Sequence, residues 1–203
     1  MLDYNSTMNL FDCAGRIYRR IWRLLFAANF KRFGVKSSIV SPLQLNGTEY
    51  IEIGDHVTIG YKSRLTAEKH NENMPRVVIE DRTRIGHFSI ISCVRDVHIG
   101  KNVITGAGAY ISDNLHEYED ITLPIKAQPT IFKDSVYIGD DTWIGVNVAI
   151  MGAKVGKHCV IGANSVVTKD IPDYCVAAGI PAKVIKRYNF EKKVWQKVNG
   201  RDE

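Results

Sequence analysis

Residues 138–169 read IGDDTWIGVNVAIMGAKVGKHCVIGANSVVTK. In this stretch a β-branched aliphatic residue is followed four times by glycine, two variable residues and a small or β-branched residue. The four units begin at Ile138, Ile144, Val155 and Ile161. Successive steps are six residues long, except for one five-residue step from Ile150 to Val155. Such a short period does not suit a helical hairpin or a propeller blade. It indicates a solenoid whose sides are short parallel strands, each buried only when the next coil stacks on it.

Each position of the unit has a predicted role. The aliphatic residue at position one points inward and stacks on its counterpart in the next coil. Position five, occupied by Thr142, Val148, Cys159 and Ser165, also points inward, where bulk would overfill the narrow core. Cys159 is therefore predicted to be a small buried apolar residue. Glycine at position two can adopt backbone angles that other residues reach only at a cost, which suits a corner.

The same unit recurs earlier in the chain, so one continuous solenoid is expected. Further units begin at Ile53, Ile59, Ile79, Ile85 and Ile99. Two segments, residues 68–75 and 112–132, interrupt the pattern and are predicted to be loops that leave the coil. With three six-residue sides per coil, about six coils fit between residues 35 and 183. The handedness of the coil does not follow from this pattern.

The composition narrows the class of protein. Of the 203 residues, 45% are hydrophobic and 24% are charged, which excludes a disordered or collagen-like chain. The net charge of +5 favours anionic partners such as phosphates. Because the sequence contains no zinc-finger or RNA-recognition motif, a nucleic-acid partner is not expected. Four cysteines without a CxxC pair suit a reducing, cytoplasmic compartment.

Residues 8–33 are predicted to form a helix, because apolar residues recur there at three- and four-residue steps. Arginines at several other positions break up any signal-peptide core, so no secretion signal is expected. The apolar run over residues 24–28 is too short to span a bilayer. Two interpretations stay open. In one, the helix covers the open end of the solenoid. In the other, it makes a peripheral contact with the inner face of an anionic membrane.

The end of the chain is predicted to leave the solenoid. Gly179 and Pro181 indicate a turn before a short basic strand. Asn189 is predicted to cap a short C-terminal helix. The expected organisation is an N-terminal helical cap over residues 1–35, a solenoid domain over residues 36–187 with a protruding loop at 112–132, and a C-terminal helix over residues 188–203.

The motifs, taken in chain order, resemble those of one family. The hexapeptide units, a loop containing His116, TWIG at 142–145, VTKDIP at 167–172 and GIPAKVI at 179–185 resemble the hexapeptide-repeat acyltransferases. Within that family they are most similar to sugar O-acetyltransferases, including the galactoside, maltose and polysaccharide enzymes. The resemblance implies an all-β solenoid, a left-handed parallel β-helix. It also implies a homotrimer with active sites between subunits, acetyl-CoA as donor, a sugar or glycan acceptor and no metal.

The resemblance further implies roles for individual residues. His116 falls at the position of the catalytic base, and Trp143 at a position near the acetyl group and the acceptor. Four residues fall at positions that line the coenzyme A groove: Ala163, Thr168, Lys169 and Lys183. The family often has arginine near the end of the last motif. This chain has Lys183 and Lys186 there, so phosphate would be bound by point charges rather than by a bidentate fork.

The chemistry expected of His116 can be stated from the residue type. A sugar hydroxyl is protonated at neutral pH, so its attack on a thioester requires a base within hydrogen-bond reach. Imidazole titrates near neutral pH and can keep one ring nitrogen as an acceptor. Asp113, Glu117 or a backbone carbonyl are candidates to orient the other nitrogen. The remaining histidines are expected on the surface of the coils or in the first loop.

Three other interpretations of the function remain open from the sequence. The acceptor could be a small galactoside or an antibiotic instead of a glycan. A zinc enzyme resembling the γ-class carbonic anhydrases would need three imidazoles, two of them on one short segment, and His116 has no such neighbour. A non-catalytic solenoid would act as an assembly platform, but it would not require the basic motif near the C-terminus.

Overall fold

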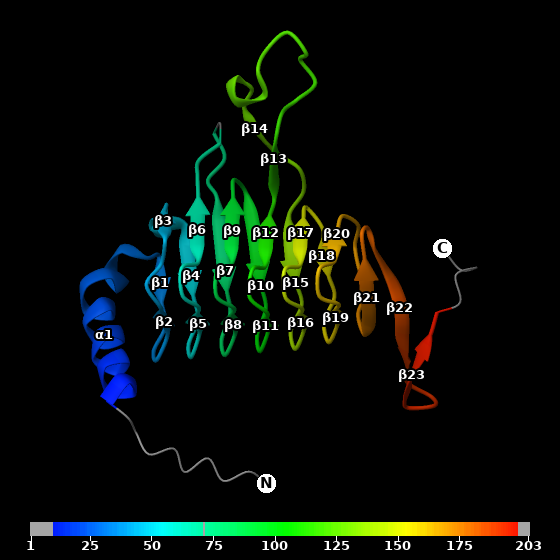
Figure 1. The fold of residues 1–203 in the computed structure, drawn as a ribbon, viewed down its shortest axis with the longest axis horizontal. Helices are drawn as coiled ribbons and strands as arrows, with labels where there is room; N and C mark the ends of the chain where they lie inside the picture. Colours follow the sequence, from blue (N-terminus) through cyan, green and yellow to red (C-terminus); the bar gives the residue numbers. More distant parts are fainter. Residues whose placement is uncertain (1–9, 71, 199–203) are drawn as a thin grey trace.

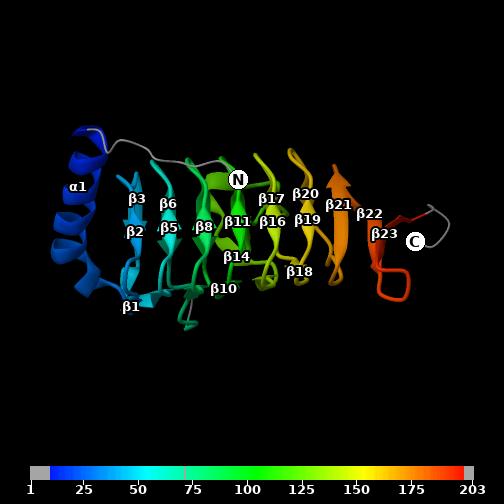
Figure 2. The same cartoon turned by 90° about the horizontal axis from the view of Figure 1, so that it is seen from below.

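The chain winds into a three-sided coil with a helix across its N-terminal end (Figure 1). The structure is a computed structural model that describes residues 10–70 and 72–198. Seen from below, successive coils lie in a single row with helix α1 (Leu10–Phe26) at one end and β23 (Val194–Lys197) at the other (Figure 2). In the described part of the chain, no helix has both the length and the hydropathy needed to cross a membrane.

The three sides of the coil are sheets of parallel strands, here named A, B and C, and two antiparallel strands extend sheet B at its C-terminal end. Sheet A consists of β1 (Arg32–Phe33), β4 (Ile51–Ile53), β7 (Arg76–Ile79), β10 (Asp96–Ile99), β15 (Val136–Ile138) and β18 (Lys154–Val155). Sheet B consists of β2 (Ser38–Ile39), β5 (Thr58–Ile59), β8 (Arg84–Ile85), β11 (Ile104–Thr105), β16 (Trp143–Ile144), β19 (Val160–Ile161), β21 (Cys175–Gly179), β22 (Ala182–Asn189) and β23. Sheet C consists of β3 (Gln44–Asn46), β6 (Arg64–Ala67), β9 (Ile90–Cys93), β12 (Tyr110–Ser112), β17 (Ala149–Met151) and β20 (Val166–Val167). With six strands in each of sheets A and C, the structure agrees with the predicted number of coils and is consistent with a left-handed β-helix.

The aliphatic residues at position one form the core, as predicted. In sheet A, Ile53 pairs with Ile79, Ile79 with Ile99 and Ile99 with Ile138. These four side chains are 0% exposed. Because burial of one such side chain contributes about 1.5–3 kcal/mol, the stacked column stabilises neighbouring coils against each other.

The small residues at position five also point inward, which confirms their predicted place. The hydroxyl of Thr142 donates to the carbonyl of Gly156 at 2.9 Å, and that of Ser165 donates to Gly162 at 2.7 Å. Because these buried hydroxyl groups are hydrogen-bonded, their burial lowers the free energy of unfolding only slightly. Cys159 is 1% exposed in the same core, as expected of a small apolar residue.

The glycine at position two is required for a reason that differs from the predicted one. The φ angles of Gly54 and Gly145 lie outside the left-handed region, whereas His56 at position four has a φ of 58°. A Cβ added to Gly54 would lie 2.7 Å from the backbone nitrogen of Asp81, and one on Gly145 would lie 2.6 Å from that of Ala163. Glycine is therefore needed because the backbones of adjacent coils approach closely.

The N-terminal helix is shorter than the predicted residues 8–33. Helix α1 ends at Phe26, a 3₁₀ turn η1 (Ala27–Asn29) follows, and β1 already belongs to sheet A. Trp22 and Phe30 are each 7% exposed and pack against Phe33 over the end of the coil. These three rings stop the helix because the chain must turn there to bury them. Residues 8–9 lie outside the described residues.

The predicted C-terminal helix is wrong. Strand β22 pairs antiparallel with β21, and β23 pairs antiparallel with β22. The Asn189 carboxamide accepts the Lys192 amide at 2.8 Å and so stabilises the turn between the last two strands. Tyr188 and Trp195 pack edge to face across this hairpin, which covers the last coil in place of a helix. Residues 199–203 of the predicted helix lie outside the described residues.

Candidate active site

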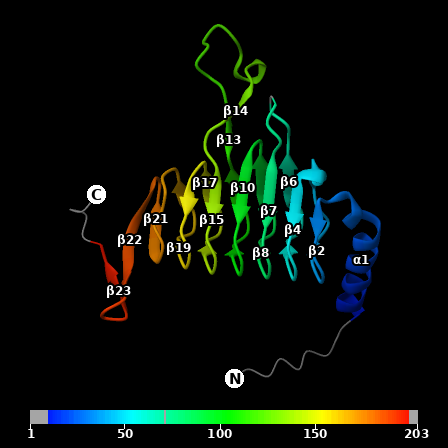
Figure 3. The same cartoon turned by 180° about the vertical axis from the view of Figure 1, so that it is seen from behind.

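Two segments leave the coil at one edge, where strands of sheet C end and strands of sheet A begin. One connects β6 to β7, and the other connects β12 to β15. Both project from the same side of the coil (Figures 1 and 3). The predicted excursions near residues 68–75 and 112–132 are therefore confirmed, and the longer one carries His116.

The longer excursion begins at Asp113, whose carboxylate is buried and fully engaged. Asp113 is 0% exposed. Its Oδ1 accepts the amide of Val94 at 2.9 Å, and its Oδ2 accepts the amides of Arg95 and Asp96, both at 2.8 Å. The carboxamide of Asn114 also donates to Oδ1 at 2.9 Å. Asp113 thus fixes the point at which the excursion leaves the coil, and it does not orient His116.

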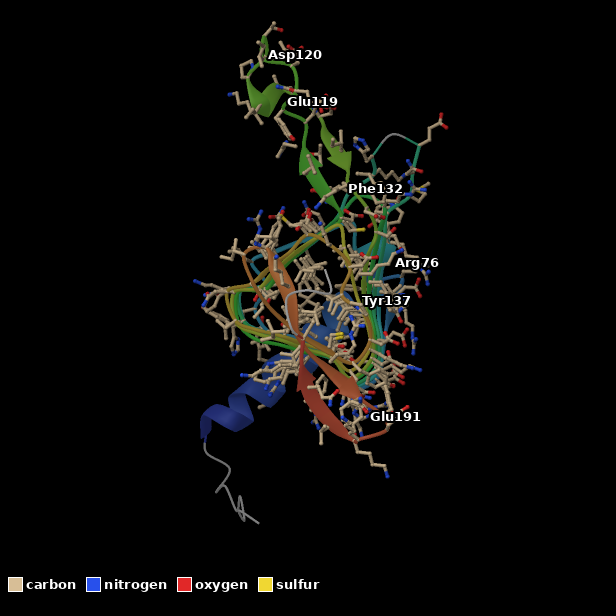
Figure 4. All side chains as sticks on the ribbon, turned by 90° about the vertical axis from the view of Figure 1, so that its right-hand side faces the viewer. Arg76, Glu119, Asp120, Phe132, Tyr137 and Glu191 are labelled. Carbon is tan, nitrogen blue, oxygen red and sulfur yellow. The ribbon has the colours of Figure 1, made fainter. Side chains whose placement is uncertain are left out.

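The two ends of the excursion form a short ladder that the sequence did not predict. Strand β13 (Asn114–His116) pairs antiparallel with β14 (Thr130–Phe132), with His116 opposite Thr130. The guanidinium of Arg95 lies 4.8 Å from the centroid of the Phe132 ring. Figure 4 shows Phe132 at the base of the excursion and Glu119 and Asp120 at its far end. This ladder gives His116 a regular backbone on which to project from the coil.

The His116 side chain is exposed. Within the described ranges, no side chain forms a hydrogen bond or ion pair with its imidazole. Neither Asp113 nor Glu117 therefore supplies the orienting contact within one chain. Both ring nitrogens are open to a ligand or to a group from a second chain.

The far end of the excursion is held by a glutamine that sequence reasoning missed. Gln128 is 6% exposed, and its Nε2 donates to the carbonyls of Asp120 at 2.9 Å and Leu123 at 3.2 Å. The 3₁₀ turn η3 (Ile125–Ala127) precedes it. The Asp120 carboxylate accepts the amide and hydroxyl of Thr122, and these hydrogen bonds lower its pKa. A lone glutamine in a polar segment carries no sequence signal that would identify this role.

Three of the predicted cofactor residues lie together in one groove. Thr168, Lys169 and Lys183 line a groove of about 420 Å³ with Asp170 and Pro181. Its size falls within the range of about 300–1,000 Å³ that is usual for ligand sites. The Asp170 carboxylate accepts the amide of Lys154 at 2.8 Å, so it is held in place by the backbone while the lysine side chains remain exposed.

The groove and the His116 segment share an edge of sheet C. Strand β12 precedes His116 and β20 precedes Thr168, and β17 lies between them in the parallel sheet. Since parallel strands end at the same edge, the two segments emerge about two strand spacings, roughly 10 Å, apart along the coil. The structure thereby places His116 and the groove along one side of the molecule.

Trp143 and Ala163 lie elsewhere in the same chain. Trp143 is in β16 of sheet B, 55% exposed, and Ala163 lies in the corner between β19 and β20. This corner borders the opposite edge of sheet C. The structure therefore divides the predicted site residues of one chain into two groups rather than bringing them all together.

Two of the other histidines make hydrogen bonds or ion pairs within the coil. His87 is exposed and its Nδ1 accepts the amide of Tyr61 at 2.8 Å. His98 is half-buried, and its Nε2 lies 2.7 Å from Glu80. Across residues 10–70 and 72–198, no group of three or more His, Cys, Asp or Glu side chains could hold a metal ion.

The sequence matches one family model and several named proteins. The family described as the hexapeptide repeat of succinyl-transferase matches residues 76–113 and 135–169. WbbJ of Escherichia coli, which is named as a putative lipopolysaccharide biosynthesis O-acetyl transferase, is 31% identical over 163 residues, which cover 77% of this chain and 81% of WbbJ. A protein of Mycobacterium tuberculosis named as a probable acetyltransferase is 42% identical over 137 residues. That match covers 67% of this chain but only 44% of the mycobacterial protein.

A solved structure has the same architecture. The N-acyltransferase AntD of Bacillus cereus, in a complex with dTDP and coenzyme A, superimposes with a TM-score of 0.67 at 16% identity, covering 84% of this chain and 91% of AntD. At this identity the likeness concerns the fold alone. With the repeat match and the extended similarity to WbbJ, the chain belongs to the hexapeptide-repeat acyltransferases, alongside sugar O-acetyltransferases.

Proposed function

We propose that this chain transfers an acetyl group from acetyl-CoA to a hydroxyl of a sugar or glycan, in the biosynthesis of a bacterial surface polysaccharide. One observation carries the proposal: the exposed imidazole of His116, which has no partner among the described residues, lies on the same edge as a groove lined by two lysines. The similarity to WbbJ, named for lipopolysaccharide biosynthesis, supports the choice of acceptor. The coenzyme A bound in AntD supports the choice of donor.

The proposed reaction is a direct transfer. A ring nitrogen of His116 accepts the proton of the acceptor hydroxyl as its oxygen attacks the thioester carbonyl carbon. The carbonyl π electrons move to the oxygen, and the tetrahedral oxyanion then collapses with cleavage of the carbon–sulfur bond. The imidazolium returns its proton to the departing thiolate, which yields the sugar ester and coenzyme A. No group beyond the thioester is needed to activate the carbonyl, so the chain requires no metal for these steps.

The lysine groove is proposed to hold the phosphates of the donor. Lys169 and Lys183 are exposed cations on its two sides, and Thr168 adds a hydroxyl. The Asp170 carboxylate opposes an anion in the same groove. Two cations against one anion leave a net positive site, and an ammonium binds phosphate as a point charge.

We propose that three copies assemble with their active sites between neighbours. In this arrangement one chain supplies the His116 segment, and the next supplies Trp143 and Ala163. Ile104 and Trp143 are neighbours on sheet B and are 43% and 55% exposed, with Val146 at the adjoining corner 46% exposed. This unpartnered apolar row supports a contact with a second copy.

An acceptor screen tests the proposed activity. Purified protein is incubated with acetyl-CoA and single acceptors from three groups: glycan fragments, small galactosides and hydroxyl-bearing antibiotics. Release of free thiol is followed with a chromogenic disulfide. We expect thiol release with glycan fragments, and activity confined to either of the other groups would contradict the assigned acceptor class.

A second part of the test concerns the groove. Lys169→Ala is expected to raise the KM for acetyl-CoA about tenfold, because one charge-assisted hydrogen bond contributes about 1.5–3 kcal/mol. Lys192→Ala, an exposed lysine in the turn before β23, is the matched control and should leave this KM unchanged. An unchanged KM in the groove variant would place the donor elsewhere.

A further inference from the structure

Helix α1 has a wider apolar surface than the part that covers the coil. The Trp22 ring is 7% exposed against the first coil, and the Tyr18 hydroxyl oxygen accepts the Ser41 hydroxyl at 3.3 Å. Other apolar side chains of the helix are exposed to solvent: Ile17, Ile21, Leu24 and Leu25 are 58%, 52%, 83% and 64% exposed. With about 100° between successive residues, these four form one stripe along the helix. This set is called the exposed stripe below.

The exposed stripe continues onto the first coil. An apolar groove of about 570 Å³ lies between α1 and the corner that precedes β3. Ile21 and Leu25 of the stripe line it from the helix, and Pro42 and Leu43 line it from the coil. Leu43 is 64% exposed. The stripe and Leu43 together form an apolar area larger than scattered single residues produce.

Positive charge surrounds this area. Arg23 of α1 is directed at the end of the coil, where its guanidinium donates to the carbonyl of Gly34 and lies over the Phe33 ring. Arg20 is exposed on the helix. On the coil, exposed Arg64 donates from Nε and Nη2 to Gln44 in the groove, at 3.0 and 2.6 Å. Lys62 is exposed one coil further along, where its amide donates to Ser41. An apolar stripe edged by cations suits an anionic surface with an apolar interior.

The placement of α1 leaves the stripe accessible. Seen along the coil, the helix extends past the outline of the three sheets (Figure 4). A helix in this position can lie in a flat surface while the coil stays outside it. A two-fold contact between two such stripes would bring the exposed Arg20 side chains of both copies together, which opposes self-association. The charge pattern therefore favours a lipid headgroup region over a second copy of the chain.

We propose that the exposed stripe, with Leu43 and the surrounding cations, docks the molecule onto the surface of an anionic phospholipid bilayer. The apolar side chains enter the boundary between headgroups and acyl chains, and the cations contact lipid phosphates. This surface lies at the N-terminal end of the coil, away from the His116 segment and the lysine groove (Figure 1). The inference is independent of the proposed acyl transfer.

Vesicle co-sedimentation tests the proposal. The full chain is mixed with vesicles of phosphatidylcholine alone or of phosphatidylcholine with phosphatidylglycerol, at low and high salt. We expect binding to the anionic vesicles that weakens as salt screens the cations. Leu24→Glu and Ile17→Glu should each reduce the partition coefficient at least about tenfold, because each removes an apolar anchor and adds a repelled charge.

Controls separate docking from folding and from activity. Met74→Glu alters a side chain that is 62% exposed in the other protruding segment and should bind vesicles like the wild type. Thiol release with a small acceptor in the absence of vesicles should be the same in Leu24→Glu and the wild type. Equal vesicle binding by wild type and Leu24→Glu would overturn the proposal. A fall in oligomer mass caused by Leu24→Glu, without vesicle binding by the wild type, would identify the stripe as a contact between copies and would also overturn it.

Discussion

At the scale of single residues, His116 and Asp113 differ in burial and in hydrogen bonding. His116 is exposed without a partner among the described residues, whereas Asp113, three residues earlier, accepts three backbone amides in the interior. The sequence placed both residues in one polar segment and offered Asp113 as a partner of His116. Burial decided their different roles, because a buried carboxylate must satisfy its acceptors locally.

Asp113→Asn tests whether the start of the excursion positions His116. The carboxamide would direct an N–H group at backbone donors, so the excursion should loosen and the free energy of unfolding should fall by about 1–3 kcal/mol. We expect kcat to fall while the KM for acetyl-CoA stays constant, because the lysine groove is untouched. Glu119→Gln at the exposed far end is the control for steady-state kinetics and urea unfolding. If Asp113→Asn changed stability but left kcat intact, Asp113 would have no positioning role.

The buried thiols predict a pH dependence of stability. Burial raises the pKa of Cys159 to about 11, above the value of about 8.5 for a solvated thiol. Between these values the unfolded chain loses a proton that the folded chain keeps, so the free energy of unfolding falls as pH rises through this window. Below it the contribution is fully present.

Cys159→Ala isolates this contribution. Urea unfolding of the variant from about pH 8 to pH 10 should give a shallower decline than the wild type shows, since the alanine has no proton to release. The other titrating groups are the same in both proteins and cancel in the difference. Parallel declines would mean that Cys159 ionises alike in both states.

At the scale of elements, the hexapeptide unit predicted most of the fold. The inward positions one and five were identified correctly, because period-six apolar residues can be buried only on the inside of a narrow coil. The C-terminal segment was assigned wrongly. Apolar residues at 190, 194 and 198 fit a helix, but so short a stretch does not distinguish a helix from a strand, and pairing with β22 decided the outcome.

Gly54→Ala and His56→Gly test why glycine recurs at position two of the hexapeptide unit. A methyl group on Gly54 would meet the Asp81 backbone at 2.7 Å, so we expect a loss of about 1–3 kcal/mol in the free energy of unfolding. His56 already has a φ of 58°, so glycine there should change stability by less than about 0.5 kcal/mol. If urea unfolding showed a larger loss of stability for His56→Gly than for Gly54→Ala, close approach of the coils would not be the reason for glycine at this position.

At the scale of the whole molecule, the predicted site residues of one chain lie in two separate groups. His116 and the lysine groove lie along one edge of sheet C, while Trp143 and Ala163 lie toward the other. The sequence motifs predicted a role for each site residue separately. They carry no information on which residues of one chain lie close enough to act together. In the proposed assembly, a group from a neighbouring chain would contact the His116 imidazole, which has no partner among the described residues of one chain.

Mixed assemblies test this division. His116→Asn and Trp143→Ala are each expected to be nearly inactive alone. When the two variants are denatured and refolded together, some neighbouring pairs combine an intact His116 from one chain with an intact Trp143 from the next. Thiol release should therefore reappear in the mixture. If refolded mixtures stayed as inactive as the separate variants, both residues would have to act within one chain.

The central claim is that His116 is the base and that the donor binds without it. The most direct measurement compares His116→Asn with the wild type in two assays: acetyl-CoA binding by calorimetry, and thiol release with the acceptor found by the screen. We predict a Kd within about twofold of the wild type and a transfer rate at least about a hundredfold lower, as expected for loss of a general base. Transfer by His116→Asn at the wild-type rate would contradict the account.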